Sequence, residues 1–326
     1  MSEAEAASSA ALAADHSEGA RAASRVLFAR VSRKTQVVVP LNARAADPAA
    51  DGPAIYCVHS IAGAGGTDFL ALTRHLGPST RMFGVQAPPK RMEEPDFGAD
   101  VSRLADVYAQ AIAEAQPSGS IVLAGWSAGA SIALEIAHCL RARGREIAFL
   151  AAVDGAPELP AGLSGWDPRY WLTVVRALPL WFSDSRAMDP TFPASTLVRL
   201  GKALVSRLRS LAAGRKPEVA PRLEGFISLD RYPAAQRQFM SRLYDAIMVY
   251  RPRPWDGPVV VYEARVGPAV VLPQYLERWR RVAPQAERAV LEGNHLTIMR
   301  EPRVANLAHD LEKRIALAEA RLREGG

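Results

Sequence analysis

One serine of this chain lies in a sequence setting that could make its hydroxyl a nucleophile. It is the central residue of the pentapeptide Gly125-Trp126-Ser127-Ala128-Gly129. The pentapeptide fits the G-x-S-x-G pattern, and it stands between a strand-like run and a helical pattern. On so sharp a turn the serine takes a strained backbone, and the glycines avoid clashes. The Ala128 amide, at the positive end of the helix, then points towards an oxyanion. The alternative is a Gly/Ser turn that arises by chance.

A serine nucleophile needs a base, and the sequence contains six histidines. His295 follows the last strand-like run in a Gly/Asn turn, which puts it at the carboxyl edge of the sheet and within reach of Ser127. His59 ends an earlier strand near the same edge, but it precedes the serine by a long way. The others lie in the N-terminal tail or in predicted helices: His16, His75, His138 and His309. We therefore predict that His295 is the base; an exposed turn histidine is the alternative.

Two acidic residues compete for the third position, which orients the imidazole. Asp154 follows the continuously apolar run 147–153, and a carboxylate that ends a buried strand needs a hydrogen-bonding partner. Glu263 follows the next strand and has Arg265 nearby as an ion-pair partner. Both satisfy the chain order serine, acid, histidine. The sheet argument slightly favours Asp154, and Glu263 stays open on the residues alone.

A glycine-rich loop follows the strand-like run 54–59. It reads Ser60-Ile61-Ala62-Gly63-Ala64-Gly65-Gly66. Glycines let the backbone turn sharply and present N–H groups inward, so we predict that the Ile61 amide joins that of Ala128 in an oxyanion hole. A phosphate-binding loop is the alternative, but the G-x-x-x-x-G-K-[ST] and G-x-G-x-x-G patterns are both missing.

Short β-rich runs alternate with longer helical patterns through most of the chain. This alternation predicts an α/β fold, with helices on both faces of a mostly parallel sheet and ligands at the carboxyl ends of the strands. The predicted strands are 25–31, 36–40, 54–59, 82–86, 120–125, 147–153, 258–264 and 287–291. The predicted helices are 67–76, 98–116, 128–143, 233–249, 272–282 and 303–322.

The composition excludes several classes of protein. Of the 326 residues, 49% are hydrophobic and 23% are charged, which excludes collagen-like, coiled-coil and wholly disordered chains. No apolar run reaches the roughly 20 residues of a membrane span. The 40 Lys and Arg exceed the 34 Asp and Glu, for a net charge of +6. Two cysteines, Cys57 and Cys139, are too few for a disulfide scaffold, and the acidic N-terminus is unlike a signal peptide, so we expect a cytoplasmic protein.

The chain is predicted to be one domain with an insertion. Residues 1–24 are expected to be a disordered tail and residues 25–326 the α/β domain. Within it, residues 157–232 contain no clear strand, and an insertion of this length is most often a lid.

These residues resemble the thioesterase domains of non-ribosomal peptide and polyketide synthases, which have the α/β-hydrolase fold. The resemblance covers about residues 37–300, and it is carried by Val38-Val39-Pro40-Leu41-Asn42, Tyr56-Cys57-Val58-His59 with the following glycines, Phe83-Gly84-Val85-Gln86-Ala87-Pro88, Gly125–Gly129, Val153-Asp154-Gly155 and Gly293-Asn294-His295. In this family the acid follows the strand after the nucleophile helix, so the resemblance implies Asp154 rather than Glu263.

The resemblance also implies a substrate and a partner. The substrate is an acyl or peptidyl chain held as a thioester on the phosphopantetheine arm of a carrier protein, or on CoA, in natural-product biosynthesis. No metal, nucleic acid or cofactor of the chain's own is expected. Three residues depart from the family's pattern without removing a catalytic group: Ser60 replaces proline, Ala130 a second elbow glycine, and Asn294 an aspartate. No carrier domain precedes residue 37, so we expect either a free-standing enzyme or part of a larger synthase.

The insertion supplies further candidates. Its aromatic residues either line an acyl-chain channel or pack the lid on the core: Trp166, Trp171 and Trp181. A basic helix at 195–213, with Arg207 and Arg209, either faces water or docks an acidic carrier protein or CoA phosphates.

The leading hypothesis is a serine thioesterase. Its competitors are an esterase or lipase acting on free esters, and a non-catalytic binding protein on the same fold.

Overall fold

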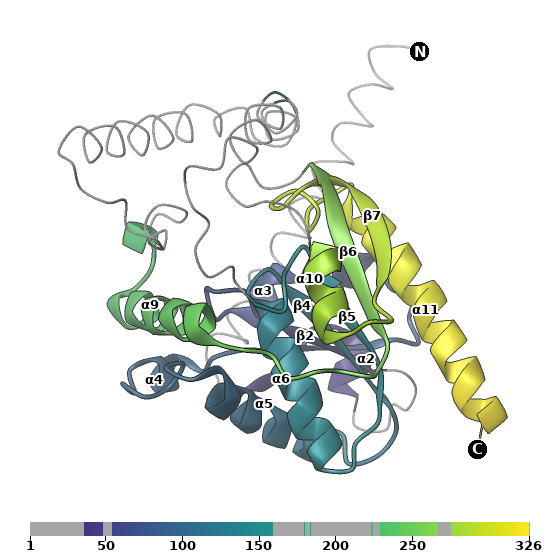
Figure 1. Ribbon diagram of the computed structural model, residues 1–326, viewed down its shortest axis with the longest axis horizontal. Helices are drawn as coiled ribbons and strands as arrows, with labels where there is room; N and C mark the ends of the chain where they lie inside the picture. Colours follow the sequence, from purple (N-terminus) through teal and green to yellow (C-terminus); the bar gives the residue numbers. More distant parts are fainter. Residues whose placement is uncertain are drawn as a thin grey trace, which may run out of the picture.

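The computed structural model describes residues 36–47, 54–158, 229–266 and 275–325, with the single positions 179, 183 and 223. Within these residues the centre is a seven-stranded sheet in the order β1-β3-β2-β4-β5-β6-β7 (Figure 1). The strands are β1 (Val38–Pro40), β2 (Ala54–Val58), β3 (Arg81–Val85), β4 (Ile121–Trp126), β5 (Ile147–Val153), β6 (Val259–Val266) and β7 (Glu287–Asn294). Only β1 is antiparallel to its neighbour, β3. The predicted mostly parallel sheet is confirmed.

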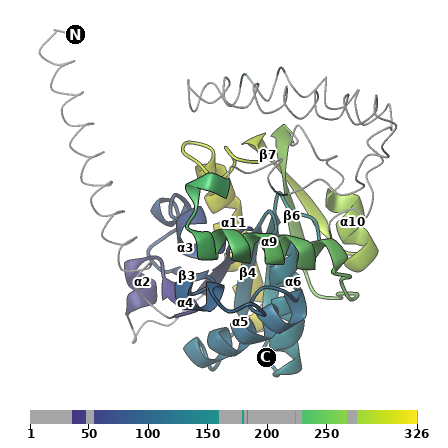
Figure 2. The same ribbon diagram turned by 90° about the vertical axis from the view of Figure 1, so that its left-hand side faces the viewer.

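Strand β2 shows how the sheet is covered on both faces. Its residues are all buried and alternate between two cores, as the period of a strand requires: Ala54, Tyr56 and Val58 face one core, and Ile55 and Cys57 face the other. The first core contains side chains of α5 (Val101–Ala115), α6 (Gly129–Ala142), α9 (Ala234–Val249) and α10 (Tyr275–Val282). The second contains side chains of α11 (Val304–Gly325), which lies across the sheet from α9 (Figures 1 and 2).

Most predicted elements in the described ranges are confirmed. Strand β5 begins and ends at the predicted residues, and the other strands agree to within three residues at each end. The long helices α5, α6, α9 and α11 also agree to within three residues. Two helices, α2 (Ala43–Ala46) and α4 (Pro89–Met92), fall outside the predicted elements, because four residues are too few to show a hydrophobic period.

The predicted helix 67–76 is wrong. The structure has α3 (Gly65–Asp68) and then a separate 3₁₀ helix (Leu72–Arg74). The hydroxyl of Thr67 donates to the carbonyl of Ala64 at 2.9 Å, and Thr73 makes the same contact with the residue three before it at 2.8 Å. Hydroxyls that bond to nearby carbonyls compete with a continuous α-helix, so the segment folds as two short turns.

Several predictions concern residues outside the described ranges. They are the tail 1–24, the strand 25–31, the basic helix 195–213, and the side chains of Trp166, Trp171, Trp181, Arg207 and Arg209. Of the insertion 157–232, the structure describes the two ends and three single positions.

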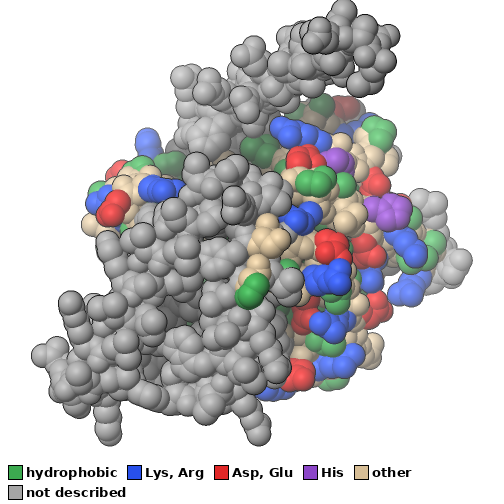
Figure 3. All heavy atoms as spheres, turned by 90° about the horizontal axis from the view of Figure 1, so that it is seen from above, with side chains coloured by type: hydrophobic (Ala, Val, Ile, Leu, Met, Phe, Trp, Pro, Cys, Tyr) green, Lys and Arg blue, Asp and Glu red, His purple; other side chains and the backbone are tan. Residues whose placement is uncertain are grey.

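The described part of the face in Figure 3 shows no large patch of a single charge. Lys and Arg side chains are interspersed with Asp and Glu over the described part of the face in Figure 3. None of the helices that the structure describes combines the length and the apolar character that a membrane crossing requires.

Candidate active site

Ser127 lies on the turn between β4 and α6, with a backbone φ of 57°. This left-handed conformation is uncommon for a residue other than glycine. The turn is held because the Ser127 amide donates to the Val153 carbonyl of β5 at 2.9 Å. A Cβ on Gly125 would overlap the Gly129 carbonyl, and a Cβ on Gly129 would lie 2.6 Å from the His59 carbonyl oxygen. The expected strained serine and the need for both glycines are confirmed.

Asp154 follows β5 and shares the left-handed conformation, with φ at 45°. Its side chain is 1% exposed, and both carboxylate oxygens are engaged. Oδ1 accepts the Ala264 amide of β6 at 2.9 Å, and Oδ2 lies 2.7 Å from His295 Nδ1. A buried carboxylate needs such partners. The structure therefore joins the predicted acid and the predicted base directly.

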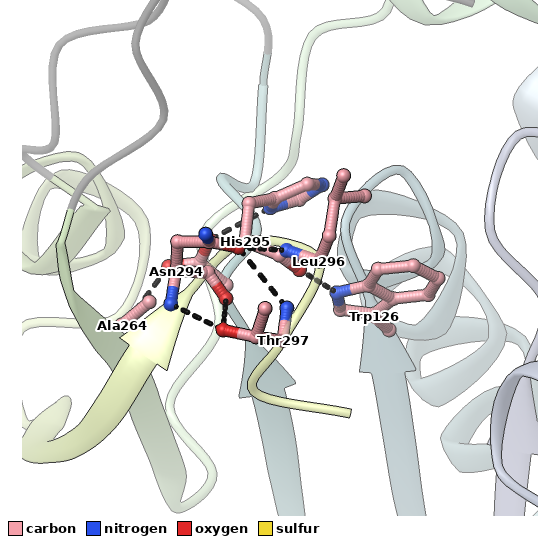
Figure 4. Close-up of polar contacts among 7 residues, drawn as sticks. Trp126, Ala264, Asn294, His295, Leu296 and Thr297 are labelled. Atoms are coloured by element: carbon pink, nitrogen blue, oxygen red, sulfur yellow. Dashed lines mark hydrogen bonds and ion pairs between the residues drawn. The ribbon is translucent and has the colours of Figure 1, made fainter. Parts of the chain in front are cut away.

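His295 stands on a tight turn directly after β7 (Figure 4). The side-chain oxygen of Asn294 accepts the amides of Leu296 and Thr297, at 2.9 and 3.1 Å. In return, the hydroxyl oxygen of Thr297 accepts the Asn294 amide at 2.8 Å. The asparagine thus uses its short polar side chain to close the turn on itself. This network fixes the main chain from which the imidazole projects.

Trp126 is a site residue that the sequence reasoning missed. Its indole Nε1–H donates to the His295 carbonyl oxygen at 3.2 Å, and the two rings stack at 28° with centroids 5.4 Å apart (Figure 4). Trp126 occupies a position that the G-x-S-x-G pattern leaves unrestricted. Its place directly before Ser127 was the available signal, since the residue beside the nucleophile lies near the base.

The three candidate residues of the triad gather at the carboxyl ends of β4, β5 and β7. The described contacts join Asp154 to His295 but contain no hydrogen bond from the Ser127 hydroxyl to His295. Such bonds are often long in an enzyme without substrate. Ser127 is connected to the pair through its neighbour Trp126 and through the Val153 carbonyl, which directly precedes Asp154.

Glu263, the rival acid, has different partners from those expected. Its Oε2 lies 2.5 Å from Arg288 Nε, and its Oε1 accepts the Leu276 amide at 3.0 Å. Arg265, the partner suggested by sequence proximity, pairs with Glu292 instead. Adjacent strands β6 and β7 bring Arg288 beside Glu263, which local sequence does not reveal. Both oxygens of Glu263 are engaged away from His295.

His59 is fully buried and supports the glycine-rich loop through its hydrogen bonds. Its Nε2 lies 2.7 Å from the Tyr108 hydroxyl, and its Nδ1 lies 2.6 Å from the Ser60 carbonyl oxygen. Burial lowers the pKa of His59 to about 4, although the bond to the Ser60 carbonyl acts in the opposite direction. The ring is therefore neutral near pH 7. Nδ1 then donates to the carbonyl, and Nε2 accepts from the tyrosine.

This lowered pKa predicts an acid-sensitive stability. Between pH 6.5 and about 4 the unfolded state binds a proton at His59 and the native state does not, so the free energy of unfolding falls as the pH falls. The loss amounts to about 3 kcal/mol on going from pH 7 to pH 4. Urea unfolding of the wild type and of His59→Gln at pH 7 and pH 4 isolates the contribution of His59 to the free energy of unfolding, because the other titrating groups are the same in both proteins. An equal pH dependence of the two proteins would contradict the prediction.

The predicted oxyanion donors lie on two segments that come close together where Gly129 packs against the His59 carbonyl. In the described part of the chain, no backbone carbonyl accepts the amide of Ile61 or that of Ala128. The next carbonyl of the glycine-rich loop, that of Ala62, accepts from the Gln236 side chain at 2.7 Å. The described residues contain no group of three His, Cys, Asp or Glu side chains placed to hold a metal ion.

Comparison with known proteins places this site in context. The family model for the thioesterase domain matches residues 53–169. Enterobactin synthase component F of Escherichia coli K12 is 34% identical over 108 residues, which are 33% of this chain and 8% of that protein. Microperfuranone synthase of Emericella nidulans is 32% identical over 109 residues, 33% of this chain and 11% of the other. The chain thus spans about a tenth of the length of these relatives.

Solved structures show the same fold. The thioesterase domain of NocB, in covalent complex with a fluorophosphonate nocardicin G analog, superposes with a TM-score of 0.53 at 20% identity, over 85% of this chain and 99% of the other. A four-domain nonribosomal peptide synthetase bound to AMP and glycine gives 0.56 at 22% identity, over 85% of this chain and 20% of the other. The predicted α/β-hydrolase fold is confirmed.

Proposed function

We propose that this chain, whose residues 53–169 match the thioesterase domain family model, is a serine thioesterase with the triad Ser127, Asp154 and His295. The observation that carries the proposal is the bond of 2.7 Å between Asp154 Oδ2 and His295 Nδ1, made beside a serine held at positive φ. A carboxylate that accepts the Nδ1 proton leaves Nε2 free to act as the base.

The proposed reaction has two halves. Ser127 Oγ attacks the thioester carbonyl carbon while His295 Nε2 takes the serine proton, and Asp154 stabilises the imidazolium. The C–S bond then breaks, and His295 returns the proton to the departing sulfur, which leaves an ester on Ser127. In the second half His295 removes a proton from water, or from a substrate amine or hydroxyl. That nucleophile attacks the ester carbon, the bond from this carbon to Ser127 Oγ breaks to release the product, and His295 returns the proton to Ser127 Oγ.

Backbone amides stabilise the oxyanion in this proposal. The tetrahedral intermediate places a negative charge on the former carbonyl oxygen, and preorganised N–H groups bind it better than the neutral carbonyl. The Ala128 amide stands at the N-terminus of α6, whose dipole favours a negative charge. The Ile61 amide is the proposed second donor. Neither has a backbone acceptor among the described residues, so both are available to a substrate oxygen.

The proposed substrate is an acyl or peptidyl chain on the phosphopantetheine arm of a carrier protein, which would be the partner. This part rests on relatives that are synthases of enterobactin and microperfuranone. The phosphopantetheine comes with the substrate, and the chemistry uses only side chains and amides of this chain. The lid residues Trp166, Trp171 and Trp181 remain proposed contacts of the acyl chain.

Trp126 is predicted to tune the rate through His295. Trp126→Phe keeps a ring beside the imidazole but removes the N–H that holds the His295 carbonyl, so kcat falls about threefold to tenfold. Trp126→Ala also removes the stacking, and kcat falls about tenfold to a hundredfold. Steady-state hydrolysis of octanoyl-N-acetylcysteamine measures both effects. An alanine variant as fast as the wild type would show that the indole does not position the base.

A comparison of leaving groups tests the proposed function. We expect a kcat/KM for octanoyl-N-acetylcysteamine at least about tenfold above that for the matching oxygen ester, ethyl octanoate, and a further gain when the octanoyl group is carried by a holo acyl carrier protein. A preference for the oxygen ester would favour an esterase or lipase. No turnover of any of the three would favour the non-catalytic binding protein.

A further inference from the structure

A second carboxylate, that of Asp68, lies under the loop that carries Ile61. Asp68 is the last residue of α3, and its Oδ2 accepts the Ser60 amide at 2.9 Å. Burial raises the pKa of Asp68, while its hydrogen bonds from the Ser60 amide and side chain act in the opposite direction. The proposed triad does not use this carboxylate, and it is directed at the residue immediately before Ile61.

Both peptide groups of Ser60 are held. The Ser60 N–H donates to Asp68 Oδ2. The Ser60 carbonyl oxygen lies 2.6 Å from His59 Nδ1 and accepts the Gly63 amide at 3.1 Å. That carbonyl shares a planar trans peptide with the Ile61 N–H, so the two groups point in opposite directions. With the carbonyl turned towards His59 and Gly63, the Ile61 N–H is turned away from them.

The residue at position 60 explains why a carboxylate is useful here. The family resemblance implies proline at this position, and a proline ring fixes φ and removes the N–H. Serine leaves φ free to rotate and adds an N–H that must be satisfied. The hydrogen bond to Asp68 engages this N–H and fixes the peptide plane before Ser60. Together with the contacts that hold the Ser60 carbonyl, it restrains the φ that a proline ring would fix.

We propose that Asp68 is a positioning residue for the oxyanion hole, which holds Ser60 so that the Ile61 amide points at the substrate oxygen. The inference rests on the proposed function, since it assigns a support to one of its two donors. Asp68 Oδ2 accepts the Ser60 amide, so Asp68 acts on the oxyanion hole through the loop that carries Ile61. The loss of Asp68 should therefore weaken transition-state binding more than substrate binding.

Four variants test this proposal with octanoyl-N-acetylcysteamine as the probe. Asp68→Ala should lower kcat about tenfold to a hundredfold with little change in KM, less than the loss of an entire oxyanion donor. Asp68→Asn keeps an acceptor oxygen for the Ser60 N–H and should stay within about threefold of the wild type. Ser60→Ala, which keeps the N–H and loses only the hydroxyl, should be affected less than Asp68→Ala.

The double variant Ser60→Pro/Asp68→Ala gives the sharpest result. Proline supplies covalently the restraint that Asp68 supplies by a hydrogen bond, so we expect kcat of the double variant to exceed that of Asp68→Ala at least about threefold. Thermal unfolding of each variant separates loss of fold from loss of rate. If Asp68→Ala is as fast as the wild type, or if proline gives no rescue, the assignment of Asp68 is wrong while the thioesterase proposal stands. A wild type that does not hydrolyse the probe would overturn both.

Discussion

Ser127→Ala is expected to lower the rate of thioester hydrolysis at least about a thousandfold while the protein stays folded. The substitution removes the oxygen on which the proposed acyl-enzyme would form, so any remaining reaction would proceed by direct attack of water. The remaining rate would come from the oxyanion amides and from substrate binding. Serine and alanine tolerate the positive φ of this turn almost equally, and the main-chain bond from residue 127 to Val153 is kept. The rate of octanoyl-N-acetylcysteamine hydrolysis, monitored through the release of the free thiol, measures the effect.

Ser131 provides a matched control four residues further along. It is a buried serine of α6 whose hydroxyl donates to the Ala156 carbonyl at 2.9 Å. Ser131→Ala removes that bond and lowers the free energy of unfolding by about 1 kcal/mol, but it removes no group of the proposed reaction. Its kcat should stay within about threefold of the wild type. A Ser127→Ala variant that keeps a tenth of the wild-type rate would exclude Ser127 as the nucleophile.

Asp154→Asn is expected to lower kcat about ten-thousandfold with only a small change in fold. The amide oxygen can still accept the Ala264 N–H, which now binds Oδ1 at 2.9 Å. The amide nitrogen then faces His295 Nδ1, where the carboxylate oxygen stood at 2.7 Å. Two donors cannot share one hydrogen bond, so the imidazole moves its proton to Nε2. The nitrogen that should accept the Ser127 proton is then already protonated, and the base is lost.

Glu263→Gln discriminates between the two acids. Both oxygens of Glu263 are engaged by Arg288 and the Leu276 amide, away from His295. The substitution weakens that ion pair and should reduce the free energy of unfolding, yet kcat should stay within about threefold of the wild type. Circular dichroism and thermal unfolding test whether Glu263→Gln and Asp154→Asn are folded. A large loss of kcat in Glu263→Gln, with Asp154→Asn close to the wild type, would reverse the assignment of the acid.

The sequence allowed the scaffold of the site to be predicted well because its signals are local. Residues 147–153 are continuously apolar, and β5 has those bounds. The glycines of the elbow predicted the close approach of two backbones, and the structure shows it at Gly125 and Gly129. The helix 67–76 failed for an equally local reason, since the hydroxyls of Thr67 and Thr73 bond back to nearby carbonyls.

The contacts that hold the site together could not be predicted because they join distant segments. Trp126 contacts His295 across 169 positions, and Asp154 accepts the Ala264 amide across 110. The partner of Glu263 is set by the pairing of β6 with β7, which brings Arg288 Nε to 2.5 Å from Glu263 Oε2, while Arg265 pairs with Glu292. Ser60 and Asp68 are only eight positions apart in the sequence. Their contact nevertheless depends on how the glycine-rich loop folds back, and residue types alone do not determine that path.

Intact mass spectrometry after rapid mixing with octanoyl-N-acetylcysteamine shows directly whether Ser127 forms an acyl-enzyme. We expect the wild type to gain the mass of one octanoyl group in place of one hydrogen, and proteolysis to locate that group on the peptide containing Ser127. Asp154→Asn should form the same adduct more slowly, and Ser127→Ala should form none. An octanoyl adduct on another residue, or hydrolysis at the wild-type rate by Ser127→Ala, would contradict the assignment of Ser127 as the nucleophile.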